Sequence, residues 1–316
     1  MAFNPIIYIE SDVASVWLPE FTRRVEELSN LSDRMALAMV GRKCVPLTIL
    51  ERTALLDRII FNNPVKIPIT DISLHESYAD IQVINKQKYI PPPRSNPPTS
   101  GNPNSGLSEL LTNGFDSSVH SLDESALIRL ILSRPGPYLY CYNLGSDHSP
   151  ADFEGYLEKD PVKRRSNVDP AVNRLIDTCP GINTSFLYIA GTLAFGEMHL
   201  EDSHLGSFNL VLTHLNNYQS SWPAKLWIIV VDNQNLIQVV RKVYKPPKKS
   251  RESICQYILH HKNLFLSVNF LKKHGIRYEV ILQAPGDCVY VFPGVFHQVI
   301  NLTPNVAEAK NYGCGF

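Results

Sequence analysis

Apolar residues follow two different periods in the two halves of the chain. In the N-terminal part they recur at helical spacing at Trp17, Leu18, Phe21, Val25 and Leu28. A second stretch at helical spacing runs over residues 47–60. Together the two stretches predict that residues 14–62 are largely helical, with Pro19 in the first turn of the earlier helix.

Beyond residue 62 the pattern changes to short apolar runs with alternating polar positions, which is typical of strands. Strands are predicted at Val65–Ile69, Ile81–Ile84, Tyr138–Tyr142, Phe186–Ala190, Ser207–Thr213, Lys225–Val231, Val280–Ala284, Cys288–Phe292 and Gln298–Leu302. Helices are predicted at 122–132, 170–178, 251–260 and 264–273. Short strands separated by turn residues predict a mainly β fold with flanking helices, arranged as an antiparallel sandwich or jelly roll.

Proline and serine mark a break in this pattern. Residues 86–122 contain a run of Pro, Ser, Asn and Gly that blocks both helix and strand and buries little surface. We therefore expect an N-terminal helical and bracing region over 1–85, a loop or linker over 86–122 and a catalytic domain over 123–316.

Charge and composition exclude several classes of function. The 316 residues hold 30 Lys and Arg against 30 Asp and Glu, so the net charge is zero, which does not favour non-specific binding to duplex nucleic acid. The N-terminus has no secretory signal pattern and the chain has no apolar run long enough for a membrane span. Six scattered cysteines do not form a disulfide framework, so a reducing compartment, nucleus or cytoplasm, is expected.

A short motif, His199-Leu200-Glu201, carries the first sign of chemistry. Residues two apart in a strand point to the same face, so His199 and Glu201 would present an imidazole and a carboxylate side by side. A second histidine, His297, follows a strongly apolar strand 96 residues after Glu201. Two histidines and one carboxylate on one face of a metal are typical of non-haem Fe(II) oxygenases. By spacing alone, the pair Asp202 and His204 is an equal alternative.

Longer segments around this motif resemble a known family. They are Gly181-Ile182-Asn183-Thr184-Ser185-Phe186-Leu187-Tyr188; His199-Leu200-Glu201-Asp202 with Ser207-Phe208-Asn209; Cys255-Gln256-Tyr257-Ile258-Leu259-His260-His261-Lys262 with Leu271-Lys272-Lys273-His274-Gly275-Ile276; and Phe292-Pro293-Gly294-Val295-Phe296-His297 through Asn311. In this order they resemble the JmjC (Jumonji C) 2-oxoglutarate oxygenases, and most the histone lysine demethylases with JmjN and JmjC segments. The resemblance implies a double-stranded β-helix, a cupin-like jelly roll.

The resemblance also implies a cofactor and a cosubstrate. His199, Glu201 and His297 match the Fe(II) ligands, which decides against Asp202 and His204. Lys225 matches the lysine that binds the distal carboxylate of 2-oxoglutarate, and Asn209 matches an asparagine that binds the cosubstrate near the iron. A tyrosine hydroxyl shares that carboxylate in the family; Tyr142 is the first choice for it and Tyr140 the second.

Further residues match the family's substrate pocket. Tyr188 matches a tyrosine that lines the methyl-lysine pocket, and a core aromatic is the alternative. Lys262 matches a lysine near the entry for oxygen or substrate, and a lysine at the end of a helix is an equal alternative. Ala309 and Lys310 stand where the family has two hydroxyl residues. Lys310 would repel a methylated ammonium if it pointed inward. The family's aromatic before the iron ligands is replaced by the stretch from Gly196, with Phe195 one place away.

A structural zinc site is a second implication of the family. Cys255 and His261 match two of its ligands in type and spacing, and Cys314 is a candidate third ligand. A tetrahedral site needs four ligands, so a cysteine packed in the core as a small apolar residue is the alternative for Cys255.

The function implied by the resemblance is an Fe(II)- and 2-oxoglutarate-dependent dioxygenase. It would remove methyl groups from lysines of a histone tail or another protein by N-methyl hydroxylation with release of formaldehyde, in the nucleus or, alternatively, in the cytoplasm. A JmjC protein side-chain hydroxylase and a catalytically idle JmjC chromatin scaffold are the two alternatives.

Overall fold

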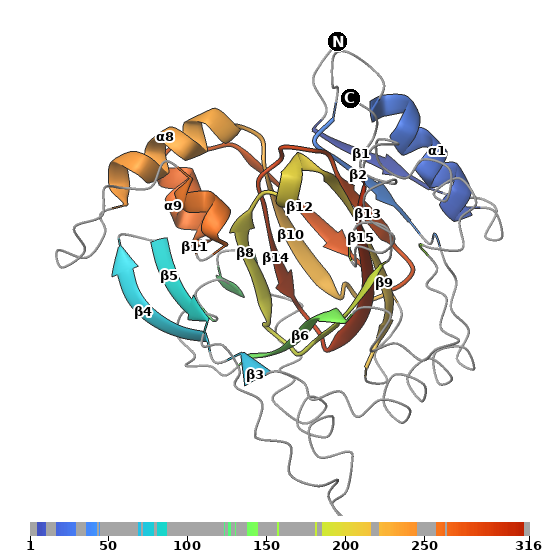
Figure 1. The fold of residues 1–316 in the computed structure, drawn as a ribbon, viewed down its shortest axis with the longest axis horizontal. Helices are drawn as coiled ribbons and strands as arrows, with labels where there is room; N and C mark the ends of the chain where they lie inside the picture. The colour runs from blue at the N-terminus through green and yellow to red at the C-terminus, as the bar shows by residue number, and fades with distance from the viewer. Residues whose placement is uncertain are drawn as a thin grey trace, which may run out of the picture.

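The computed structural model describes residues 5–10, 17–29, 36–42, 44, 69–70, 72–78, 81–86, 123, 126–127, 130, 138–144, 157, 181, 185–215, 221–244, 257–262 and 264–312. Two β-sheets at the centre of the molecule face each other, with helices at opposite sides (Figure 1). This arrangement of mostly antiparallel strands confirms the predicted double-stranded β-helix, or jelly roll.

The larger sheet has eight strands. In spatial order they are β1 (Ile6–Ile9), β2 (Ala38–Gly41), β13 (Cys288–Val291), β9 (Gly206–His214), β15 (Asn305–Tyr312), β7 (Phe186–Ala190), β6 (Tyr138–Leu144) and β3 (Ile69–Thr70). Among these, β1 and β2 run parallel, and the other described pairs are antiparallel.

The second sheet has four strands and a third sheet has three. The four-stranded sheet runs β12 (Tyr278–Gln283), β10 (Lys225–Val230), β14 (His297–Asn301) and β8 (Phe195–His199). The three-stranded sheet runs β11 (Leu264–Leu266), β5 (Ile81–Lys86) and β4 (Ile72–Tyr78). Since β8 and β12 are the outer strands of the four-stranded sheet, each pairs on one side only within the described chain.

Short helices cover the outer faces of the sheets. They are α1 (Trp17–Ser29), α8 (Asn233–Val243), α9 (Val268–Lys273) and the 3₁₀ turns η2 (Asp202–His204) and η3 (Ile258–His261). Helix α8 begins where the Asp232 side chain accepts a hydrogen bond from the backbone N–H of Asn235 at 3.1 Å, and α9 begins in the same way at Ser267. In the described residues no helix is long and apolar enough to cross a membrane.

Two apolar cores follow from this layering. The first lies between α1 and the eight-stranded sheet, where Phe21 packs edge-on against Phe208 with ring centroids 6.2 Å apart. The second lies between the four-stranded sheet and α8, α9 and β11, and it buries Leu236 and Val240 of α8. The first core also extends between the two sheets to inward-facing residues of β10 and β12, and other residues of the inner faces line a cavity.

The structure confirms most of the predicted strands and corrects several other predictions. Residues 38–41 form strand β2 because they pair with β13 inside the large sheet, although helical spacing placed them in a helix. Residues 264–266 are strand β11 rather than the start of the helix that begins at 268. The sequence patterns did not indicate helix α8 or strand β15.

Other predicted elements fall partly or wholly outside the described residues. Among residues 122–132, the described positions 126, 127 and 130 are helical. The predicted helices at 47–60 and 170–178, the strand residues 65–68 and the helix residues 251–256 lie outside the described part of the chain.

Candidate metal centre

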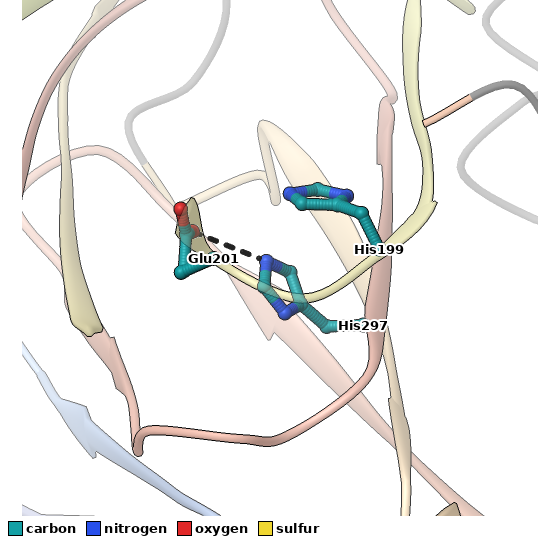
Figure 2. A group of neighbouring side chains, drawn as sticks. All are labelled: His199, Glu201 and His297. Carbon is teal, nitrogen blue, oxygen red and sulfur yellow. Dashed lines mark ion pairs between the residues drawn. The ribbon is translucent and has the colours of Figure 1, made fainter. Parts of the chain in front are cut away.

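His199 and His297 lie directly opposite each other on the neighbouring strands β8 and β14. Their ring centroids are 4.3 Å apart. The pairing shifts register between His297 and Val299, so the two rings are held at the end of the regular ladder. Figure 2 shows both rings turned toward the carboxylate of Glu201.

One nitrogen of each ring forms a hydrogen bond with a backbone carbonyl. Nδ1 of His199 lies 2.6 Å from the carbonyl oxygen of Glu197, and Nδ1 of His297 lies 3.0 Å from that of Val295. A carbonyl oxygen only accepts, so Nδ1 of each neutral ring carries the proton and donates it. The lone pair of each Nε2 then points into the site, which is the tautomer that a metal-binding histidine needs.

Glu201 follows strand β8 in an extended conformation, with φ −65° and ψ 150°. That backbone carries on the alternation of the strand and brings the carboxylate to the side of His199. Its Oε1 lies 3.4 Å from Nε2 of His297, and its Oε2 lies 3.4 Å from Nδ2 of Asn311. The ligand atoms of His199, Glu201 and His297 all lie within 4.8 Å of one another. Neighbouring ligands of one metal ion are roughly 3 Å apart when each bond is about 2.1 Å, so this donor set fits a single divalent ion.

The protonation states suit the same role. Burial is the largest cause that lowers the pKa of His199 to about 4, and the charge of His297 adds to it against the opposing effect of Glu201. Burial would raise the pKa of Glu201, but the hydrogen bond with His297 and the charges of His297, His199 and Lys262 outweigh it and bring the pKa to about 2. At neutral pH, His199 is therefore neutral and Glu201 ionised, as metal ligands must be.

A cavity of about 390 Å³ contains this group. It lies between the two large sheets, because its walls come from β8, β10 and β14 of one sheet and from β7, β9 and β15 of the other. The lining residues are Gly181, Phe186, Tyr188, Gly196, His199, Glu201, Asp202, Ser207, Asn209, Lys225, Trp227, Lys262, His297, Val299, Ala309 and Asn311.

Lys225 supplies a buried amino group to this cavity, which carries a positive charge when it is protonated. Its side chain is 2% exposed, and burial alone lowers the pKa of its ammonium to about 7. Asn209, on the opposite sheet, is also buried, and its Oδ1 makes no hydrogen bond with the described residues. No charge of a described residue is among the causes of the lowered pKa of Lys225, so this buried amine and the buried amide of Asn209 fit an anionic ligand that binds beside a metal.

A buried glutamine connects the two walls of the cavity. Gln283 lies directly across from Lys225 in the pairing of β12 with β10. Its Oε1 accepts the indole N–H of Trp227 at 2.8 Å, and its Nε2 donates to the carbonyl oxygens of Asn209 at 2.8 Å and Asp287 at 3.0 Å. Gln283 therefore holds one residue of each sheet at the cavity. The Trp227 ring is in turn 5.8 Å from that of His297, at 32°.

The eight-stranded sheet supplies the aromatic and small residues of the cavity. The rings of Phe186 and Tyr188 meet edge to face, with centroids 6.5 Å apart. Ala309 and Asn311 lie on the same face of β15 and line the cavity with them. Lys310, between these two, lies on the other face of the strand, is 4% exposed and is not among the residues that line the cavity.

Charged residues meet at the mouth of the site. The ammonium of Lys262 lies 2.9 Å from Oδ1 of Asp202. The backbone of Lys262 is left-handed, with φ 50°, and so are those of Ser203 and His204 in η2. Asp202 and His204, the alternative metal pair by spacing, are both exposed, and the His204 ring lies 6.1 Å from that of His260 rather than in the metal group.

Four predicted residues fall outside the side chains that the structure describes. Tyr142 and Tyr140 are in β6, next to the cavity strand β7, but only the backbone of β6 is described. Cys255 and Cys314 lie outside the described residues, and His261 is exposed at the end of η3. The zinc site therefore stays a prediction.

Several lining residues were not predicted from the sequence. They are Phe186, Ser207, Trp227, Val299 and Asn311. Each stands two positions from a predicted residue in the same strand, so the period of two along a strand was the signal that could have found them.

Comparisons with known proteins agree with this geometry. Residues 186–312 match the family model of the JmjC domain, described as a hydroxylase. The human protein named probable lysine-specific demethylase 4F is 31% identical over 170 residues, which are 51% of this chain and 25% of that protein.

Two further relatives are lysine-specific demethylase 4D of Rattus norvegicus and lysine-specific demethylase 4B of Mus musculus. Each is 26% identical, over 53% and 51% of this chain and over 31% and 14% of the relative. The chain thus spans less than a third of the length of these relatives.

Proposed function

We propose, on the premise that residues 186–312 form a JmjC domain, that the protein is an Fe(II)- and 2-oxoglutarate-dependent dioxygenase that demethylates lysine residues of a histone tail or another protein in the nucleus. One observation carries the proposal. The ligand atoms of His199, Glu201 and His297 converge within 4.8 Å in a cavity that also holds the buried cation Lys225.

The histidines and the glutamate would hold the iron by three positions on one side, which leaves the other side for ligands. When bound, the iron supplies the activation of oxygen and the oxidation of a C–H bond. The chain fixes the two rings through the carbonyls of Glu197 and Val295, so neither ring needs to change tautomer when the metal binds. Asn311 holds the outer oxygen of Glu201 in place.

Lys225 would bind the distal carboxylate of 2-oxoglutarate. A carboxylate beside the ammonium removes the cost of burying the charge and keeps the lysine protonated. Gln283 lies opposite Lys225 and accepts a hydrogen bond from the indole N–H of Trp227. It therefore fixes the position of Trp227, which lines the cavity between Lys225 and the metal group. The buried Asn209, opposite, offers an amide to the same ligand.

Support for a methylated lysine comes from the wall on the eight-stranded sheet. A methylated ammonium has an apolar surface and a diffuse charge, and aromatic rings attract it. Phe186 and Tyr188 provide two such rings, and Ala309 leaves space between them and the metal group. Lys310 does not oppose such a substrate, because it lies on the other face of β15. The zero net charge favours a substrate recognised as a tail rather than through duplex DNA.

The test measures products in the same reaction. The full chain is incubated with Fe(II), ascorbate, 2-oxoglutarate and histone peptides in each methylation state, and succinate, formaldehyde and peptide masses are followed. Succinate with equimolar formaldehyde and a loss of 14 mass units from a lysine is the expected result. A gain of 16 mass units without formaldehyde would indicate a side-chain hydroxylase instead.

A pair of histidine variants provides the control. His199→Ala removes a metal ligand and should abolish both products, whereas His204→Ala removes an exposed histidine outside the metal group and should retain them. Absence of succinate from the unchanged protein with every peptide would refute the enzymatic function and favour a scaffold.

A further inference from the structure

The floor of the cavity is a row of three residues across the four-stranded sheet. Val299 on β14 lies opposite Gly196 on β8 and opposite Trp227 on β10. All three line the cavity. Side-chain size therefore decreases across the sheet from Trp227 to Val299 to Gly196. Gly196, which has no side chain, is on the outer strand of the sheet.

This row lies between the two groups that bind the cosubstrate. Lys225 precedes Trp227 by two residues on β10, and His297 precedes Val299 by two residues on the antiparallel strand β14. Two residues of a strand span roughly 6.8 Å. A ligand that reaches from the metal group to the ammonium of Lys225 must therefore pass its carbon chain over Val299 and Trp227, with Gly196 beside this path on the neighbouring strand β8.

Space remains above Gly196. Among the described residues, a Cβ atom added at this position would meet one neighbour within 4 Å, the Cε1 of His199 at 3.9 Å, which is an ordinary van der Waals contact. The backbone does not require glycine either, because Gly196 is not among the glycines with a left-handed φ. The preceding side chain, Phe195, is buried in the core on the far side of the strand, with its ring 4.5 Å from that of Phe265. The notch beside His199 thus has the size of at least one methyl group.

We propose that the notch at Gly196 is a subsite for a small apolar substituent on the carbon chain of the cosubstrate, so that the protein binds 2-oxo dicarboxylates with a methyl or ethyl branch as well as 2-oxoglutarate. This inference rests on the proposed function. The notch is closed on its inner side by Val299 and belongs to the four-stranded sheet, whereas Tyr188 and Ala309 of the substrate wall belong to the eight-stranded sheet. A branch there replaces water by apolar contact without displacing the peptide.

Binding is measured by titration calorimetry of the full chain loaded with Ni(II), which keeps the reaction from proceeding. The ligands are 2-oxoglutarate and its 3-methyl, 3-ethyl, 4-methyl and 4-ethyl derivatives, each titrated into the same protein. Quenching of tryptophan fluorescence provides a second readout, since Trp227 lies in the row. The expected result is that at least one branched ligand binds to the unchanged protein within threefold of 2-oxoglutarate.

Two variants change the notch in opposite directions. Gly196→Val fills the notch and should raise the dissociation constant of that branched ligand at least tenfold relative to that of 2-oxoglutarate. Gly196→Ala should have an intermediate effect and replaces the valine variant if the latter does not fold. Val299→Ala widens the floor and should favour the ethyl over the methyl branch. Gln238→Ala, on an exposed position of α8, should leave the ratio of the two dissociation constants unchanged.

The outcomes separate the two proposals. If 2-oxoglutarate itself does not bind to the metal-loaded protein, the proposed function fails. If 2-oxoglutarate binds but every branched ligand binds more than threefold weaker to the unchanged protein, or if Gly196→Val leaves the ratio of dissociation constants as it was, the subsite is refuted while the proposed function stands.

Discussion

Binding of 2-oxoglutarate should take up a proton, because Lys225 is close to half protonated at neutral pH in the free protein. Burial lowers the pKa of its ammonium from 10.5 to about 7, and at 1.36 kcal/mol for each pKa unit this corresponds to about 5 kcal/mol. A carboxylate bound beside the ammonium raises the pKa again. At pH 8 most of the free protein has a neutral Lys225, so binding should take up about 0.9 proton.

Two measurements follow for the metal-loaded protein. Calorimetric titrations in buffers of different ionisation enthalpy give the proton uptake directly. The dissociation constant should also rise close to tenfold for each pH unit between about pH 7.5 and 9, because each step leaves fewer molecules with a charged Lys225. Lys225→Met keeps most of the apolar stem but has no proton to gain, so it should bind weakly and with no such pH dependence.

Stability of the free protein gives an independent check of the same shift. The folded pKa of Lys225 lies below the unfolded value, so the unfolded chain binds more protons between about pH 7 and 10.5. The cost of burying the charge is therefore present in full below pH 7 and fades as the pH rises through this window. Lys225→Met should raise the free energy of unfolding at pH 7 by up to about 5 kcal/mol, less at pH 10. A flat affinity between pH 7 and 9 with no proton uptake would show that the cosubstrate carboxylate does not contact Lys225.

Four further substitutions test other parts of the site. Gln283→Leu should lower the free energy of unfolding by about 3 kcal/mol and raise the dissociation constant of 2-oxoglutarate, because the indole N–H of Trp227 and the carbonyl of Asn209 lose their partner; denaturant titration and calorimetry measure the two effects. Asp202→Ala breaks an ion pair whose carboxylate is 79% exposed, so denaturant titration should show a change below about 1 kcal/mol. Ala309→Lys should lower kcat/KM for methylated peptide at least a hundredfold by placing a cation in the cavity, whereas Lys310→Met, on the other face of β15, should leave the KM of that peptide within threefold. Equal effects of the last two substitutions would contradict the assigned orientation of β15.

The metal group could be predicted from the sequence, although strand spacing alone left the pair Asp202 and His204 equally possible and the family segments decided between the two pairs. Strand periodicity places the ligand-bearing side chains of His199 and Glu201 on one side, and the strand after an apolar run carries His297. Glu201 lies just beyond the end of β8, where strand pairing no longer fixes the direction of its side chain. The alternation continues to Glu201 because its backbone stays extended. The same period would have added Trp227 from Lys225 and Asn311 from Ala309.

Other features depend on contacts between distant segments, which no local pattern contains. Residues 38–41 become a strand because β13 offers an edge to pair with, although β13 lies about 250 residues later in the chain. The sequence of strand β15 is polar and contains alanines, so it lacks the apolar alternation of a strand. It is nevertheless a strand that pairs with β7 on one edge and with β9 on the other. The environment of Lys310 could not be predicted either, because the face on which it lies depends on the register of β15 against β9.

The N-terminal strands contribute to the site through the same pairing. Strand β2 pairs with β13, and Arg42, next to the end of β2, contacts Asp287, next to the start of β13, at 2.6 Å. The carbonyl of Asp287 accepts one of the two hydrogen bonds from Nε2 of Gln283, and the other goes to Asn209 in the cavity wall. Arg42 is partly exposed but Asp287 is buried, so loss of Arg42 would leave a buried carboxylate without its cation and loosen the turn that holds Gln283. Residues 36–42 therefore reach the cavity wall through Asp287 and Gln283, and this is the contact through which the predicted bracing role of the N-terminal region would act.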